Sequence, residues 1–252
     1  MNTVKDNLKA GKVVVGTGAG VDPIAAGLLG DTGFDFLLFD TQHSTAQPKE
    51  LAPAIAALKG KKASPVVRVG DNRADLILNA MDAGARGVIV PMVNTGEEAA
   101  RVVRAVKYYP EGDRSNGGQR GEWGKEFPAY RDYLDTANSE MLIVVMIETK
   151  QSLANIDAIC STPGIDVLLV GPSDFSIELD VPLDYPSKTY QDALDQVVAG
   201  ANRHGVAAGM YFIPPGMDPN FYIEKGFKFF TVPWAPMAAD GIGKALGGIN
   251  RG

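Results

Sequence analysis

The chain has only one cysteine, Cys160, in 252 residues, and therefore it cannot form an intrachain disulfide. Its first twelve residues lack the apolar stretch of a secretory signal. The apolar runs at 142–147 and 167–171 end long before they reach the length that a bilayer requires. These absences exclude a membrane-spanning chain and predict a protein of the reducing cytoplasm.

An excess of basic residues is also missing. The chain has 24 Lys and Arg against 30 Asp and Glu, a formal net charge of -6 and a pI of about 5.0, with the two signs interspersed. This distribution argues against a nucleic-acid surface and against a polybasic membrane anchor. We therefore expect small-molecule partners, and neither nucleic acid nor membrane.

Apolar residues are present in a regular rhythm. They make up 45% of the chain, which is enough for one sizeable core. Short runs rich in Val, Ile, Leu and Phe alternate with stretches of helical periodicity, as in a buried parallel sheet covered by helices. Eight such runs lie near residues 13, 36, 65, 87, 142, 166, 206 and 227. We therefore predict an α/β protein in which residues 1–252 form a single (β/α)8 TIM barrel, with a closing helix in 236–248.

One segment, residues 110–140, interrupts this rhythm. It is polar and glycine-rich, and it is longer than an ordinary connection of such a barrel. Arg114, Arg120 and Trp123 cluster in it, which favours a lid-like excursion that covers a site. A solvated surface loop is the alternative.

Polar residues gather where several of the predicted strands end. Because the active sites of such barrels lie at the carboxyl ends of the strands, these residues should meet at one mouth. They are Asp40, Gln42 and His43 after the second run, Arg68 in the third, Glu148 after the fifth and Asp174 after the sixth.

Glu148 and Asp174 follow strongly apolar runs, where an unpaired charge is costly to bury. A hard cation such as Mg²⁺ or Mn²⁺ would offset that cost, and two carboxylates leave positions open for a chelating substrate. A 2-oxo acid chelates through a carboxylate oxygen and the keto oxygen, and Arg68 would neutralise the enolate that develops from it. Salt bridges or helix caps are the alternative roles of the two acids.

His43 lies in a loop after a strand. Histidine is the side chain best suited to proton transfer near neutral pH, so we interpret His43 as a general base that Asp40 or Asp82 orients. Amides of the turn Gly171–Asp174 would bind the substrate carboxylate. Lys150, just beyond the fifth strand, leaves a Schiff-base mechanism open.

A glycine-rich stretch offers a competing interpretation. Gly16 and Gly18, with Asp40 about 20 residues later, partly match a dinucleotide-binding fingerprint. The match fails at Val21, where the third glycine should stand, and it leaves the acids after the fifth and sixth strands unexplained. We therefore interpret these glycines as a close-packed turn of the barrel.

The chain resembles the HpcH/HpaI aldolase family over nearly its whole length. The resemblance is carried by segments 33–44, 66–115, 146–176 and 224–232, in order and at family-like spacing. It implies a barrel of the phosphoenolpyruvate/pyruvate type and a class II pyruvate aldolase. By this resemblance His43 is the base, Arg68 stabilises the transition state, Asp82 supports the histidine, Glu148 and Asp174 bind Mg²⁺, Mn²⁺ or Co²⁺, and Ser173 contacts the substrate through its backbone.

Such an enzyme reversibly cleaves a 4-hydroxy-2-oxo acid to pyruvate, or a similar 2-oxo acid, and an aldehyde through a metal-bound enolate. Oxaloacetate decarboxylation or acyl-CoA cleavage through the same enolate is the alternative, as is a barrel that binds a 2-oxo acid without turnover. Three positions depart from the family pattern: Gln42 stands where the aldolases often have glutamate, Ser44 where they usually have glycine or alanine, and Met146 where some have a substrate-contacting glutamine. Gln42 and Met146 are expected to line the substrate site.

The resemblance also implies a homo-oligomer, either a trimer or a hexamer, with sites near subunit boundaries. Asp82 and part of the 110–140 excursion are therefore expected to act on a neighbouring subunit.

Overall fold

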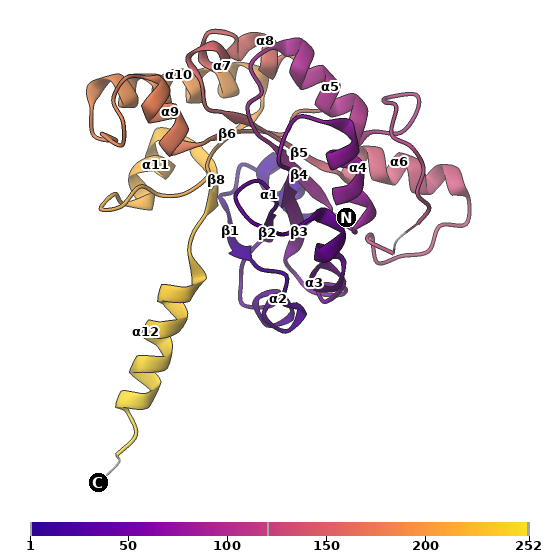
Figure 1. The fold of residues 1–252 in the computed structure, drawn as a ribbon, viewed down its shortest axis with the longest axis horizontal. Coiled ribbons are helices and arrows are strands. Elements are labelled where there is room, and N and C mark those ends of the chain that lie inside the picture. Colours follow the sequence, from indigo (N-terminus) through magenta and orange to yellow (C-terminus); the bar gives the residue numbers. More distant parts are fainter. Residues whose placement is uncertain (1, 120, 251–252) are drawn as a thin grey trace.

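The computed structural model describes residues 2–119 and 121–250. Eight parallel strands pair in chain order and close into a barrel, because β8 is hydrogen-bonded to β1 (Figure 1). All eight predicted runs form strands, so the (β/α)8 prediction is confirmed. The strands are β1 (Val14–Ala19), β2 (Phe36–Asp40), β3 (Ser64–Arg68), β4 (Gly87–Val90), β5 (Leu142–Ile147), β6 (Val167–Val170), β7 (Ala207–Met210) and β8 (Phe227–Thr231).

Helices follow the strands, and several begin where a polar side chain accepts a hydrogen bond from a first-turn amide, as Asp22, Thr95 and Ser187 do. No helix in the described ranges is long and apolar enough to cross a membrane. The helices are α2 (Pro23–Leu29), the 3₁₀ helix η1 (Pro48–Leu51), α3 (Ala52–Ala56), α4 (Ala74–Asp82), α5 (Gly96–Val106), α6 (Tyr130–Glu140), α7 (Lys150–Ala154), α8 (Ile156–Cys160), α9 (Pro172–Glu178), α10 (Lys188–His204), α11 (Pro219–Lys225) and α12 (Trp234–Gly247).

The barrel interior is filled by large apolar side chains and leaves no room at some backbone positions. Phe36 stacks on Phe229 with ring centroids 4.4 Å apart. A Cβ atom on Gly16 would lie 2.3 Å from the Phe36 ring, so glycine is required there for packing. Gly16 is therefore a close-packed residue within β1, whereas a Cβ on Gly18 would meet nothing within 4 Å, so the interpretation of a close-packed turn holds for Gly16 alone. Helix α1 (Thr3–Lys9) covers the amino-terminal end, where Val4 joins the interior cluster.

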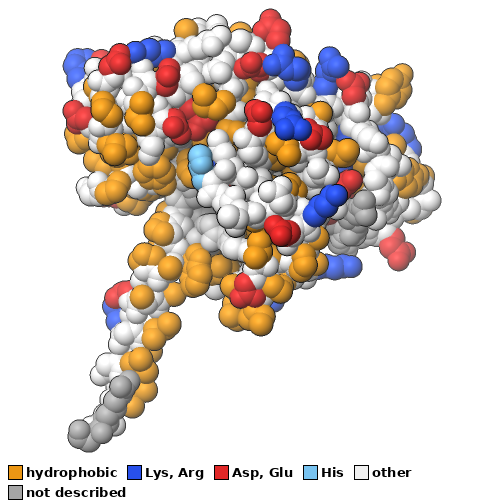
Figure 2. Space-filling view, viewed as in Figure 1, with side chains coloured by type: hydrophobic (Ala, Val, Ile, Leu, Met, Phe, Trp, Pro, Cys, Tyr) orange, Lys and Arg blue, Asp and Glu red, His pale blue; other side chains and the backbone are white. Residues whose placement is uncertain are grey.

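Helix α12 departs from the prediction of a closing helix. The segment is helical, but it projects away from the barrel and has no buried residue (Figure 1). Hydrophobic side chains lie along the projecting helix, exposed to solvent (Figure 2). The periodicity of 236–248 was therefore a correct signal for a helix, but α12 does not cover the barrel of its own chain.

Candidate active site

The strand alternation brings four polar side chains to the carboxyl end of the barrel, hereafter the mouth. Successive side chains of a strand point alternately into the barrel and toward the helices. The interior cluster contains alternate residues of β2 and β5, such as Leu142, Val144 and Met146 of β5, together with Val66 of β3. One further step of this alternation in β2, β3, β5 and β7 gives Asp40, Arg68, Glu148 and Tyr211.

Arg68 and Asp40 form a bidentate ion pair across neighbouring strands, where they are register partners. Nε of Arg68 donates to Oδ1 of Asp40 at 2.8 Å, and Nη2 donates to Oδ2 at 2.6 Å. Burial would raise the pKa of Asp40, but hydrogen bonds and charge from Arg68 outweigh it and hold the pKa below its ordinary value. Asp40 is therefore ionised at neutral pH and fixes one edge of the guanidinium group.

Tyr211 lies over the same guanidinium group. The Cζ atom of Arg68 is 4.0 Å from the centroid of the Tyr211 ring. Burial raises the pKa of Tyr211 to about 12, against the opposing charge of Arg68, so the phenol is neutral at ordinary pH. Tyr211 is not among the predicted site residues, although the period-two spacing of Ala207, Gly209 and Tyr211 along β7 is a signal that points to it.

Glu148 is buried at the end of β5, with 2% of its surface exposed. The amide of Met92 donates to its Oε2 at 3.0 Å, and Met92 has a left-handed backbone with φ of 55°, which is strained for a side chain of this size. A Cβ on Gly171 would lie 2.3 Å from Oε1 of Glu148, so Gly171 leaves room for the carboxylate. Burial raises the pKa of Glu148, and the charge of Asp174 adds to this effect, whereas the Met92 amide and Arg68 oppose it.

The two acids fit a divalent cation. Asp174 is exposed in the first turn of α9, close enough for its charge to act on Glu148. A cation held by both carboxylates would relieve their repulsion and the cost of burying Glu148. Within residues 2–119 and 121–250, no three His, Cys, Asp or Glu side chains are grouped to hold a metal ion. Water and substrate oxygens would therefore complete the shell, as is usual for Mg²⁺.

His43 lies in an exposed loop that is tied back to the end of β2. The amide of Gln42 donates to Oδ1 of Asp40 at 2.9 Å, and Oγ of Ser44 donates to the Asp40 carbonyl at 2.5 Å. Both carboxylate oxygens of Asp40 bond Arg68, so the structure pairs Asp40 with the arginine. Oε1 of Gln42 is buried and has no hydrogen-bond partner among the described residues.

Comparison with known proteins agrees with this geometry. Residues 19–234 match the model of the HpcH/HpaI aldolase/citrate lyase family. The chain belongs to this family. It is 34% identical over 232 residues to a 5-keto-4-deoxy-D-glucarate aldolase of Salmonella paratyphi C, a match that covers 92% of this chain and 90% of the relative.

Solved structures give the same result for the fold. An HpcH/HpaI aldolase/citrate lyase family protein of Burkholderia cenocepacia J2315 superposes with a TM-score of 0.85 at 28% identity, covering 98% of this chain and 99% of that chain. Macrophomate synthase superposes with a TM-score of 0.80 at 25% identity, covering 98% of this chain and 89% of that one. The protein is thus a carbon-carbon lyase of the aldolase type.

Two residues that the sequence analysis assigns to the site, Asp82 and Met146, lie away from the mouth. Asp82 is the last residue of α4, and Nη2 of Arg114 is 3.8 Å from its Oδ1. Helices of a (β/α)8 barrel run antiparallel to the strands, so the end of α4 lies toward the amino-terminal side. Met146 has no exposed surface and packs in the interior cluster below Glu148. The structure therefore brings neither of these side chains to the mouth of its own barrel.

The 110–140 excursion also lies toward the amino-terminal side, because it connects α5 to β5. Trp123 is buried, and the guanidinium group of Arg86, just before β4, lies 5.4 Å from the centroid of its ring. Arg114 is buried against the ring of Tyr108, and Arg120 lies outside the described residues. The described part of the excursion thus packs on the flank of the barrel of its own chain.

Lys150 has surroundings that do not suit a Schiff base. Its Nζ lies 2.5 Å from Oδ2 of Asp180, and both side chains are more than half exposed. A lysine nucleophile requires a lowered pKa, which a desolvated or cationic environment provides and an aspartate partner does not. The geometry therefore favours enolate chemistry without a lysine adduct.

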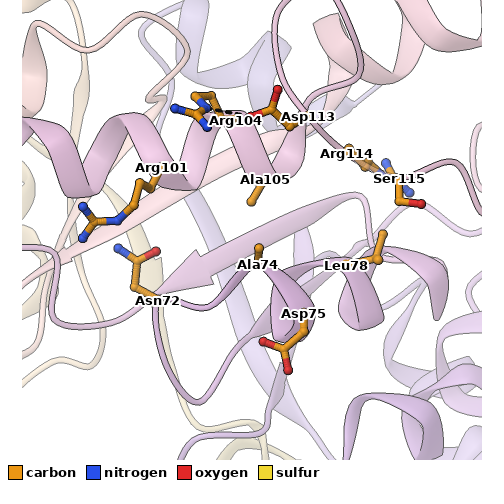
Figure 3. Close-up of a pocket in the computed structure, with 10 residues that line it drawn as sticks. All are labelled: Asn72, Ala74, Asp75, Leu78, Arg101, Arg104, Ala105, Asp113, Arg114 and Ser115. Carbon is orange, nitrogen blue, oxygen red and sulfur yellow. Dashed lines mark hydrogen bonds and ion pairs between the residues drawn. The ribbon is translucent and has the colours of Figure 1, made fainter.

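A hollow of about 360 Å³ lies outside the barrel, between α4 and α5 (Figure 3). Its charged groups are already paired, since Nε of Arg104 donates to Asp113 at 2.8 Å and Arg73 beside it pairs with Asp75. The Nε and Nη1 atoms of Arg114 are buried and so do not face this open space. None of the mouth residues lines it; the lining is Asn72, Ala74, Asp75, Leu78, Arg101, Arg104, Ala105, Asp113, Arg114 and Ser115.

Proposed function

We propose that the protein reversibly cleaves a 4-hydroxy-2-oxo acid to pyruvate, or a similar 2-oxo acid, and an aldehyde, with a divalent cation bound by Glu148 and Asp174. The observation that carries this proposal is the buried Glu148 carboxylate, which shares the mouth with a second acid and with Arg68. The name of the Salmonella relative supports a sugar-acid substrate of this class.

Glu148 and Asp174 would hold Mg²⁺, Mn²⁺ or Co²⁺. When bound, the cation would polarise the keto group of the substrate. The Met92 amide and the absence of a side chain at Gly171 keep the Glu148 carboxylate in place for this role. The amide group of Ser173, in the first turn of α9, is the proposed contact of the substrate carboxylate, because the Gly171 amide donates to the Ile147 carbonyl at 3.4 Å.

Arg68 and His43 would act on the substrate itself. His43 takes the proton of the C4 hydroxyl, and the C3–C4 bond breaks to release the aldehyde. The electron pair of the broken C3–C4 bond passes into the C2–C3 enolate. Because Asp40 occupies the Nε edge of Arg68, the remaining edge of the guanidinium group is available to oppose the enolate charge. A proton returned to C3 then completes the pyruvate methyl group.

The remaining predicted residues keep supporting roles in this proposal. Gln42 contacts the substrate from the loop that carries His43, and Met146 forms the floor below Glu148. Asp82 of the partner subunit supports His43, and the 110–140 excursion covers the site of that neighbour. A cytoplasmic location stays a prediction that rests on the cysteine content.

Exchange of the pyruvate methyl protons in D₂O tests the function, because every catalytic version of the site forms the enolate. We expect exchange, followed by proton NMR, with added Mg²⁺ or Mn²⁺, its loss in EDTA, and its recovery when the metal is returned. Full exchange in excess chelator would contradict the metal-dependent proposal. Exchange that never exceeds the protein-free rate would favour a barrel that only binds the 2-oxo acid.

Oxaloacetate decarboxylation or acyl-CoA cleavage is the second candidate, since the matched family includes citrate lyases. It uses the same enolate and the same residues. Comparing kcat/KM for oxaloacetate with kcat/KM for 4-hydroxy-2-oxo acids distinguishes the candidates.

The proposed homo-oligomer, a trimer or hexamer, is supported by helix α12. In chain order its place on the barrel is between α11 and α2, where Ile24 and Leu28 of α2 remain 73% and 71% exposed. Ile242, Leu246 and Ile249 recur at helical spacing along the projecting segment and are exposed. Two such unpartnered apolar faces fit an arrangement in which α12 of one copy packs on another.

Charges placed on this face should reduce the size of the assembly. We expect the double variant Ile242→Asp, Leu246→Asp to have a lower mass than the wild type by light scattering, because each carboxylate would be buried against an apolar partner. Lys244→Glu, on the opposite face of the same helix, is the matched control and should keep the wild-type mass. A double variant of unchanged mass would show that α12 is not an assembly contact.

A further inference from the structure

Tyr211 directly follows the last residue of β7, and a backbone hydrogen bond fixes its position. Its amide donates to the carbonyl of Val170 at 2.9 Å. The pairing of β7 with β8 shifts register between Ala208 and Gly209, two residues before Tyr211. Such irregularities re-aim side chains near active sites. A Cβ on Gly209 would lie 2.9 Å from the carbonyl oxygen of Phe229, so the close approach of the two strands requires glycine.

The ring of Tyr211 supplies a restraint on Arg68 that Asp40 does not. The two hydrogen bonds to Asp40 fix one edge of the guanidinium group but allow its plane to tilt about that edge. The Tyr211 ring face, 4.0 Å from Cζ, opposes this tilt. Attraction between a cation and a ring face is strongest where water is excluded, and the Arg68 side chain is 5% exposed.

We propose that Tyr211 is a positioning residue for Arg68, whose ring face holds the guanidinium plane so that its outer edge meets the bound 2-oxo acid. The inference rests on the proposed function, because it matters only if Arg68 opposes the enolate charge. It assigns the task to the aromatic ring; the hydroxyl group is not required for it.

Two substitutions separate the ring from the hydroxyl group. Tyr211→Phe keeps the ring over Arg68, whereas Tyr211→Leu keeps an apolar side chain and removes the ring. Phe212→Leu is the matched control, since Phe212 is the next residue and the centroid of its ring lies 6.4 Å from that of the Tyr185 ring. Thermal melting of each variant verifies that the barrel is folded.

The readout is metal-dependent deuterium exchange at the methyl group of pyruvate, with kcat and KM determined separately. Tyr211→Leu should lower kcat about ten- to hundredfold with little change in KM, because the misplaced arginine acts in the transition state. Tyr211→Phe should retain a third or more of the wild-type kcat.

Three other results would contradict either the positioning role of Tyr211 or the proposed function. An active wild type with equal kcat in Tyr211→Leu and Phe212→Leu refutes the positioning role and leaves the proposed function standing. A loss in Tyr211→Phe as large as that in Tyr211→Leu assigns the effect to the hydroxyl group and also refutes it. A wild type that exchanges no deuterium with metal present overturns the proposed function, and the inference about Tyr211 falls with it.

Discussion

Glu148→Gln should lower the rate of metal-dependent pyruvate exchange by about a thousandfold or more. Glutamine has nearly the same shape and can still accept the hydrogen bond from the Met92 amide, so the fold is retained. The substitution removes the negative charge that is proposed to bind the cation. The rate at saturating Mn²⁺ measures the effect, and Glu178→Gln, at an exposed acid of α9, is the control expected to keep the wild-type rate.

The same variant should stabilise the metal-free protein. The pKa of Glu148 is raised in the folded state above its ordinary value of 4.5 because the carboxylate is buried. The folded protein therefore binds more protons than the unfolded chain above that pH, and its free energy of unfolding falls as pH rises from about 4.5 toward the folded pKa. Glu148→Gln removes the buried charge, and with it this decrease in the free energy of unfolding.

Melting in EDTA tests the sign of this effect. We expect the Tm of Glu148→Gln to exceed that of the wild type by a few degrees at pH 7, and the difference to shrink as pH falls toward 4.5. Mn²⁺ should raise the Tm of the wild type and leave that of the variant unchanged. A variant that melts lower than the wild type in EDTA would show that the buried Glu148 charge does not destabilise the folded protein. A variant that Mn²⁺ still stabilises would show that Glu148 is not a metal ligand.

The barrel could be predicted from the sequence because the signals for its strands are local. The eight apolar runs, and the polar residues directly after them, follow from strand burial and from the common direction of parallel strands. The same reasoning placed Asp40, Arg68, Glu148 and Asp174 at one end, although it did not show that Asp40 pairs with Arg68. That pairing depends on the register of β2 with β3, which hydrophobic pattern alone does not fix.

What escaped prediction depends on packing or on connectivity. The period-two spacing along β7 points to Tyr211 as a residue of the mouth, but it does not show that the Tyr211 ring lies over Arg68, because that contact depends on packing. The apolar face of α12 identifies a helix but does not show that the helix projects away from the barrel of its own chain. The position of Trp123 on the amino-terminal flank follows from the fact that the excursion connects a helix to a strand, so chain order was the relevant signal.

Arg68→Lys should reduce kcat for exchange by about a hundredfold or more, even though the positive charge is kept. Lysine cannot form the two-point contact with Asp40 or present a second planar edge to the substrate, and its ammonium group has no fixed plane for Tyr211 to hold. The decrease in activity should appear mainly in kcat, because the negative charge of the enolate develops only as the C–H or C–C bond of the substrate breaks. Cleavage of a 4-hydroxy-2-oxo acid should fall in parallel with pyruvate exchange.

Arg203→Lys is the matched control, because Arg203 also donates two hydrogen bonds to an aspartate, Asp157, but on the outer helices. It should keep the wild-type kcat and a nearly unchanged Tm, as expected of an exposed ion pair. If Arg68→Lys retained a tenth or more of the wild-type kcat, a positive charge alone would be sufficient at this position. The planar contact between Asp40, Arg68 and Tyr211 would then have no catalytic role, and the enolate charge would be stabilised chiefly by the groups around Glu148.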